Sequence, residues 1–147
     1  MRILLIELIS TCKRFIVNAK LRFLGYNIHR TALIESNVVL DKVYPSSLII
    51  GEFTLVARGS VILTHDHHKR EVNGDPKRYR TVIGSNCFIG INAIILPGVK
   101  VGNNVIIGAG AIVKDDIPDN SIAAGSPARV VKQGIMTRPY GIVIDQL

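Results

Sequence analysis

The sequence predicts an all-β protein: a parallel β-helix with a short helical segment at its N-terminus and one projecting loop. Three observations support this fold class. Aliphatic residues recur every six positions over much of the chain, and a small residue often follows each of them by four positions. The composition is 48% hydrophobic but only 5% aromatic, which suits a β-structure whose core positions are small and repetitive.

The six-residue period is clearest in the second half of the chain. The aliphatic column there comprises Ile83, Ile89, Ile95, Val101, Ile107 and Val113. The second column comprises Cys87, Ala93, Val99, Val105 and Ala111. A period of six fits neither an α-helix nor a long alternating strand. It fits short strands joined by tight corners, with three strands to a triangular coil and the aliphatic side chains stacked inside.

The same frame extends upstream of the clear repeat. It places in the aliphatic column Ile28, Ile34, Leu40, Ile50, Val56 and Ile62. The frame slips between Leu40 and Ile50, so we expect residues 41–47 to bulge out of the coil. Glycines follow the aliphatic column at Gly84, Gly90, Gly102 and Gly108. Glycine suits such corners because it tolerates positive φ and close backbone approach.

The length of 147 residues fits a single domain. Residues 1–27 mix apolar and basic side chains, and we expect them to form a helical cap over the open end of the core. The β-helix is expected over residues 28–132, interrupted by a polar, register-breaking loop at 67–81. Residues 133–147 are expected to form a C-terminal tail.

Charge and cysteine content narrow the possible partners. A formal charge of +7 is compatible with an anionic ligand or membrane, but no nucleic-acid motif accompanies it, so we expect no nucleic-acid partner. Cys12 and Cys87 form no CxxC pair, which argues against a zinc or disulfide framework. The apolar run Met1–Ser10 is too short to span a bilayer. We therefore expect a cytoplasmic protein, with peripheral membrane contact through the basic N-terminal segment as an open alternative.

Three of the four histidines lie together in the sequence THDHH. Histidine is the natural general base near neutral pH. His65 is the fourth residue of the hexad that starts at Ile62, which predicts a position at a coil edge. His67 lies beyond the last in-register residue and is the second choice. Either Asp66 or Glu52 could orient His65 as a carboxylate does in a triad.

The stretch VIGSNCFIGINAIILPGVKVGNNVIIGAGAIVKDDIPDNSIAAGSPARVVK resembles the hexapeptide-repeat acetyltransferases. It is most similar to the branch of galactoside, maltose, nodulation-factor, xenobiotic and polysaccharide O-acetyltransferases. The resemblance implies a left-handed coil, acetyl-CoA as the donor, and a homotrimer with active sites between neighbouring subunits. The family's catalytic histidine falls on His65.

The resemblance also implies a donor site. The oxyanion donor would be the backbone amide of Ile91, and the pantetheine arm would lie along Ala109, together with Gly90 and Gly108. The residues implied to meet the nucleotide phosphates are Lys114, Arg129 and Lys132. The order Lys114–Asp115 departs from the family's Thr-Lys. The acceptor is expected to contact Asp66, His67 and Tyr79, the last of these in the projecting loop.

The sequence thus predicts direct transfer of an acetyl group from acetyl-CoA to a hydroxyl of a sugar or polysaccharide precursor. Alternatives are an amino-sugar N-acetyltransferase, a serine O-acetyltransferase or a non-catalytic scaffold. A γ-type carbonic anhydrase would need three zinc histidines from separate turns, and three of the four histidines here share one pentapeptide. No metal is therefore expected, and nothing in the chain identifies the acceptor.

Overall fold

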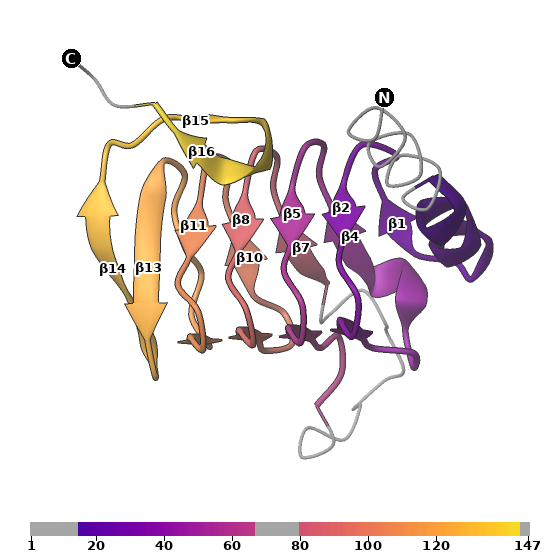
Figure 1. Cartoon of the computed structure of the whole chain (residues 1–147). Helices are drawn as coiled ribbons and strands as arrows, with labels where there is room; N and C mark the ends of the chain where they lie inside the picture. The colour runs from indigo at the N-terminus through magenta and orange to yellow at the C-terminus, as the bar shows by residue number, and fades with distance from the viewer. Residues whose placement is uncertain (1–14, 67–79, 145–147) are drawn as a thin grey trace, which may run out of the picture.

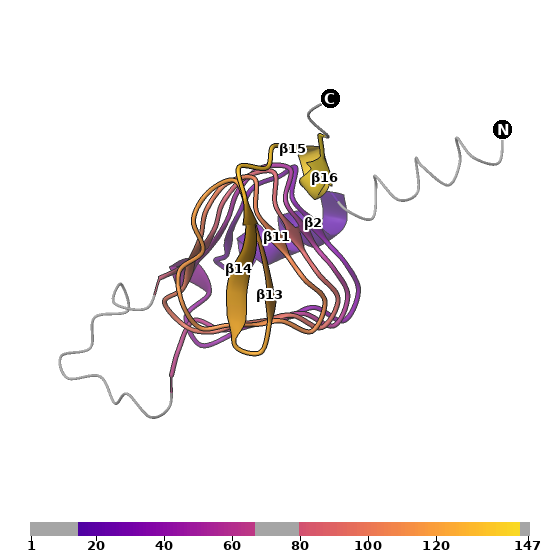
Figure 2. The ribbon, with the colours of Figure 1, turned by 90° about the vertical axis from the view of Figure 1, so that its left-hand side faces the viewer.

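The computed structural model describes residues 15–66 and 80–144. These residues form a left-handed parallel β-helix, whose strands stack into three faces around a triangular cross-section (Figures 1 and 2). The first face contains β1 (Asn27–Ile28), β4 (Leu48–Ile50), β7 (Thr81–Ile83) and β10 (Lys100–Val101). The third face contains β3 (Val39–Leu40), β6 (Val61–Ile62), β9 (Ile94–Ile95) and β12 (Ile112–Val113).

The second face is the longest. It contains β2 (Leu33–Ile34), β5 (Leu55–Val56), β8 (Phe88–Ile89), β11 (Ile106–Ile107), β13 (Ser121–Gly125) and β14 (Ala128–Gln133). Every pair is parallel except the last, because β14 turns back antiparallel to β13. We expected the β-helix to run to residue 132. Its last strand, β14, instead forms an antiparallel hairpin with β13. We call the corners that follow the three faces the first, second and third corner.

The predicted register is confirmed in the core. The aliphatic column is buried from Ile28 onward, apart from the half-buried Ile34, and the small column from Cys87 to Ala111 is buried with it. Strands pair in register, so that Ile62 stacks on Ile95. The core is therefore one continuous column of stacked aliphatic side chains.

Several corners have a glycine directly after the aliphatic column and a residue with positive φ two positions later. The glycines that follow the aliphatic column do not have positive φ; the positive values fall two residues later, at Asn86, Asn92, Asn104 and Gly110. A Cβ on Gly84 would lie 2.5 Å from the carbonyl oxygen of Gly102 in the next coil. Of the two reasons expected for glycine here, close approach between coils is therefore the one that applies.

The irregular segment after β3 widens the third corner. It contains the 3-10 helix η1 (Pro45–Ser47). The expectation that residues 41–47 simply bulge outward is only partly correct, because Asp41 and Ser47 are buried. Asp41 turns inward under the corner of the following coil, where it accepts hydrogen bonds.

The helix and the tail pack on different parts of the coil, although the Tyr140 hydroxyl of the tail reaches the Thr31 carbonyl of the first coil. A helix over residues 15–23 covers the N-terminal end (Figure 1), and its Asn18 side chain donates a 2.7 Å hydrogen bond to the Ala32 carbonyl. The tail forms the hairpin β15 (Thr137–Arg138) and β16 (Ile142–Val143), joined by η3 (Pro139–Gly141). The Tyr140 amide donates to Phe53 at the first corner. Within the described residues, no helix has the length and apolar character needed to cross a bilayer.

Candidate active site at two corners of the coil

His65 lies at the third corner, three residues after β6 ends. Its side chain is 20% exposed, whereas that of Asp41, from the preceding coil, is 2% exposed. The imidazole Nδ1 makes a short hydrogen bond with Asp41 Oδ2. The ring of Tyr44 meets the imidazole edge-on, with the ring centroids 6.5 Å apart. The imidazole is thus held at a coil edge by one buried carboxylate and one aromatic ring.

Asp41 is fixed by the backbone around it. Its carboxylate accepts the amides of Val43 at 2.9 Å, Thr64 at 2.8 Å and His65 at 3.0 Å. Burial raises the pKa of Asp41, but hydrogen bonds from the Val43 and Thr64 amides and the His65 and Thr64 side chains outweigh it. The net result is a pKa below the usual value, so Asp41 is a carboxylate at neutral pH.

An ionised Asp41 sets the tautomer of His65. The Nδ1–H donates to the carboxylate, so the Nε2 of the neutral ring carries the lone pair. This is the arrangement that a general base needs. The carboxylate that holds Nδ1 is Asp41, rather than Asp66 or Glu52, the two that the sequence suggested.

The second corner offers backbone donors. Ile91 and Ala109 occupy equivalent positions there, and both are exposed. Within residues 15–66 and 80–144, neither of their amides has a hydrogen-bond acceptor. At equivalent corner positions a side chain from a neighbouring turn accepts the amide: Glu35 for Arg58, Asn103 for Ser85, and Asp119 for Asn103. The Ile91 and Ala109 amides can therefore donate to a bound molecule.

Gly90 and Gly108 also lie at the second corner. A Cβ on Gly90 would lie 2.6 Å from the Ala109 amide nitrogen, and one on Gly108 would lie 3.0 Å from Ala124 Cβ. Close stacking of the coils is therefore sufficient to explain Gly90. Gly108 is less tightly enclosed.

The two corners are separated within one chain. The third face, with β6 and β9, runs between the second corner and the third corner. Each strand of that face begins at the second corner and ends at the third. His65 and the Ile91 amide therefore lie at opposite edges of one sheet and are not brought together by a single subunit.

The basic residues expected to meet phosphates lie near the C-terminal end of the coil. Arg129 Nη1 lies 3.0 Å, and Lys114 Nζ 3.2 Å, from Asp115 Oδ2. The Lys114 side chain and then the Arg129 side chain lower the pKa of Asp115. These groups are exposed, so the ion pairs are screened by solvent. An incoming phosphate would compete with Asp115 for both cations, while Lys132 lies exposed on β14.

The remaining predicted site residues are only partly described. Asp66 is half-buried at the start of the loop, and His67 and Tyr79 lie outside the described residues. Among residues 15–66 and 80–144, no three His, Cys, Asp or Glu side chains are grouped so that they could hold a metal ion.

Known proteins share this repeat. Residues 80–115 match the family described as bacterial transferase hexapeptide (six repeats). The galactoside O-acetyltransferase of Escherichia coli (strain K12) is 39% identical over 112 residues, which are 74% of this chain and 55% of that protein. The galactoside O-acetyltransferase of Lactococcus lactis subsp. lactis (strain IL1403) is 34% identical over 117 residues, 76% of this chain and 55% of that protein.

A solved structure shows the same fold. The maltose O-acetyltransferase from Clostridium difficile 630 superposes with a TM-score of 0.57 at 29% identity, covering 77% of this chain and 72% of that one. The chain spans about half the length of the two curated galactoside relatives.

Proposed function

We propose that this chain, which belongs to the bacterial hexapeptide-repeat transferases, moves an acetyl group from acetyl-CoA to a hydroxyl of a sugar or polysaccharide precursor. Galactoside and maltose O-acetyltransferases are among the proteins that it resembles. The observation that carries the proposal is the hydrogen-bonded pair His65–Asp41 at a coil edge. Buried Cys87 is a free thiol, which fits the reducing cytoplasm as the proposed location.

The proposed reaction is direct transfer. His65 Nε2 takes the proton of the acceptor hydroxyl as its oxygen attacks the thioester carbonyl. The new C–O bond forms, the C–S bond breaks, and the leaving thiolate takes the proton back from the imidazolium. Asp41 stabilises the imidazolium between these two steps without being protonated itself.

When the acceptor oxygen attacks, negative charge develops on the oxygen of the thioester carbonyl. This oxyanion needs a hydrogen-bond donor, and His65 cannot provide it while it acts as the base. The Ile91 amide at the second corner is suitable, because it has no hydrogen-bond acceptor among the described residues. Since the two corners lie at opposite edges of the third face, the proposed site combines His65 of one subunit with Ile91 of a partner subunit.

A threefold ring would bring these two corners together. If the third face of each subunit points to the axis, the second corner of one subunit meets the third corner of the next. The outward residues of that face form an apolar ladder: Val39, Val61, Ile94 and Ile112. Val39 is 53% exposed. Association would cover this ladder, which supports the proposed homotrimer.

The donor would lie along the second corner. Ala109 and Gly108 offer the small surface that a pantetheine arm needs, and Arg129, Lys132 and Lys114 supply charge for the nucleotide phosphates. Asp115 already holds Arg129 and Lys114. Binding of the phosphates would therefore exchange the Asp115 contacts for stronger ones to phosphate.

Replacing His65 with Ala tests the proposal. We expect turnover to fall by roughly 100- to 10,000-fold, the usual contribution of a general base, with little change in the affinity for acetyl-CoA. Turnover is measured as thiol release from acetyl-CoA with sugars, amino sugars and serine as acceptors. The matched control is His29→Ala, an exposed histidine of the first coil. Wild-type turnover in His65→Ala would refute the assignment.

A further inference from the structure

The helix that covers the N-terminal end of the coil exposes apolar side chains. Phe23 is 90% exposed, Ile16 65% and Phe15 64%. Ile16 and Phe23 are seven residues apart and lie on one side of the helix. Asn18 and Leu21 lie on the other side, which packs on the coil. The outward side of this helix therefore presents large apolar side chains beside the exposed Lys20, where a solvated helix would be mostly polar.

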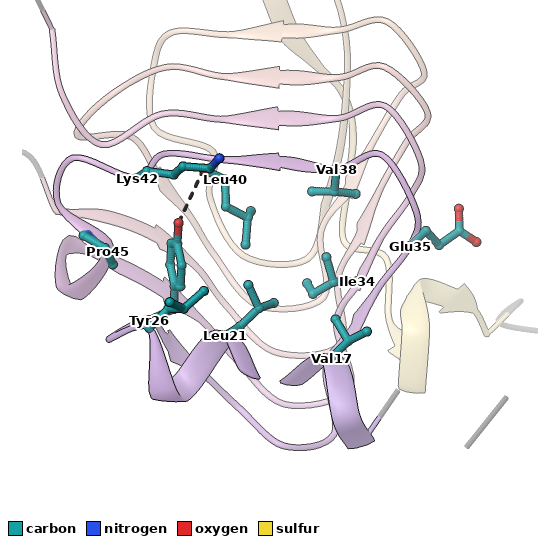
Figure 3. Close-up of a pocket in the computed structure, with 10 residues that line it drawn as sticks. Val17, Leu21, Tyr26, Ile34, Glu35, Val38, Leu40, Lys42 and Pro45 are labelled. Atoms are coloured by element: carbon teal, nitrogen blue, oxygen red, sulfur yellow. Dashed lines mark hydrogen bonds between the residues drawn. The ribbon is translucent and has the colours of Figure 1, made fainter. Parts of the chain in front are cut away.

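An apolar cavity adjoins this helix. It has a volume of about 390 Å³ and opens between the helix and the first coil. Val17, Leu21, Ile34, Val38 and Leu40 converge on it, with Lys42 and Glu35 towards its edges (Figure 3). The apolar surface of this end thus extends from the exposed helix into the edge of the core.

Cations surround the apolar surface. Lys20, Arg22, Arg30 and Lys42 are all exposed. In the part of the chain that the structure describes, none of the four forms an ion pair. The Glu35 carboxylate accepts the Arg58 amide. This end of the coil therefore combines exposed aromatic and aliphatic side chains with four exposed cations that form no ion pair among the described residues.

We infer that this end of the coil docks on an anionic lipid bilayer. Phe15, Ile16 and Phe23 would enter the interface between headgroups and acyl chains, as the apolar side of an interfacial helix does. The basic residues would lie among the anionic headgroups. A second copy fits this surface poorly, because a twofold contact would place the same four cations against one another. The inference does not depend on the proposed acetyl transfer.

Vesicle sedimentation with the full chain tests the inference. The vesicles contain phosphatidylcholine alone or phosphatidylcholine mixed with phosphatidylglycerol. We expect the chain to sediment with the mixed vesicles, and salt to weaken this binding. The double variant Ile16→Ser/Phe23→Ser should bind at least about tenfold more weakly. Lys20→Gln/Arg22→Gln should bind roughly 25-fold more weakly, since each basic residue contributes about a fivefold factor.

A control pair lies at the far end of the molecule. Val131 and Met136 are 65% and 53% exposed, so Val131→Ser/Met136→Ser also removes exposed apolar side chains, but away from the helix, and should leave binding unchanged. Circular dichroism and the mass from sedimentation equilibrium are measured for every variant. The inference is overturned if the wild type does not bind the mixed vesicles. It is also overturned if Ile16→Ser/Phe23→Ser and Lys20→Gln/Arg22→Gln both bind them as tightly as the wild type does. A lower mass for Ile16→Ser/Phe23→Ser would assign the surface to a second copy instead.

Discussion

At the scale of single residues, Asp41 links the third corners of the first two coils. Its carboxylate accepts amides from its own corner and from the corner that carries His65. The same oxygen that holds the Thr64 amide holds the imidazole Nδ1. A change at Asp41 should therefore affect both the orientation of the imidazole and the stability of the fold.

Replacing Asp41 with Asn should lower kcat by about 100-fold or more, because an amide can hold the imidazole in the wrong tautomer. In the proposed reaction Asp41 acts by positioning His65, so KM for acetyl-CoA should change little. Steady-state kinetics and the pH profile of kcat/KM check this. Glu52→Gln is the matched control, since Glu52 is exposed and should be replaceable. A variant Asp41→Asn with the wild-type kcat and pH profile would contradict the positioning role.

Asp41 also makes stability depend on pH. Its pKa is lower in the folded chain than the usual value of about 4. Its stabilising effect is therefore complete above that value and is lost as pH falls through the folded pKa. In urea unfolding, the wild type should exceed Asp41→Asn in stability at pH 7, and the difference should narrow below about pH 4. A difference that stays constant with pH would show that the carboxylate charge is not responsible.

The sequence placed His65 at a coil edge but did not indicate that Asp41 would be its carboxylate partner. His65 follows an in-register strand, so its place at a coil edge could be counted from Ile62. Asp41 comes immediately after Leu40, where the six-residue frame is lost, and 24 residues separate it from His65. Counting in sixes cannot place a residue in an irregular segment. The available signal was an acidic residue directly after a core position of the third face.

At the scale of the elements, the coil depends on the closeness of successive turns. Gly84 has no room for a Cβ, because the Gly102 carbonyl of the next turn would lie 2.5 Å away. Gly108 faces the Ala124 side chain at 3.0 Å instead. Neither glycine has positive φ, so the two differ mainly in what surrounds them.

Gly84→Ala should therefore destabilise the fold more than Gly108→Ala. We expect a loss of about 1–3 kcal/mol in the free energy of unfolding for Gly84→Ala, as for other overpacked sites. For Gly108→Ala we expect a change within about 1 kcal/mol. Urea unfolding with circular dichroism measures both. Equal losses for the two variants would show that backbone closeness is not the limiting factor.

Most of the elements followed from the period, and the exceptions have physical reasons. The aliphatic and small columns predict the strands because each inward side chain must fill one level of the core. The antiparallel strand β14 was not expected. The turn that reverses the chain lies in the sequence SPAR, and the six-residue repeat is no longer clear there, so the turn did not appear as a break in the pattern. The tail hairpin β15–β16 was missed because its contacts, such as Tyr140 to Phe53, join segments that share no pattern.

At the scale of the whole molecule, the proposed site belongs to an assembly. His65 and Ala109 lie at different corners, on either side of the third face. A chain with both corners intact would still need a neighbour to complete one site. A site shared between subunits therefore predicts a result that a site contained within one chain does not predict.

Two inactive variants should restore activity when they are mixed. His65→Ala removes the proposed base, and Ala109→Trp blocks the proposed donor corner. If the chains are co-expressed in equal amounts and assemble at random, about a quarter of the sites should combine two intact corners. Thiol release by the mixture measures this recovery, with each variant alone as the control. No recovery in a mixture shown to contain both chains in one particle would contradict the shared site.

The regular stacking of the coils fixes how far His65 lies from the N-terminal end of the β-helix. Neighbouring strands lie about 4.8 Å apart, and His65 closes the second coil from the end that carries the helix over residues 15–23. With that end on a bilayer, one coil spacing of about 5 Å and the helix, about 10 Å thick, would together place the imidazole roughly 15 Å above the headgroups. The number of coils between the bilayer and His65 would then set the height of the active site above the membrane. A saccharide carried by a membrane lipid would be acetylated on the sugar units next to its carrier, and units farther along would lie out of range.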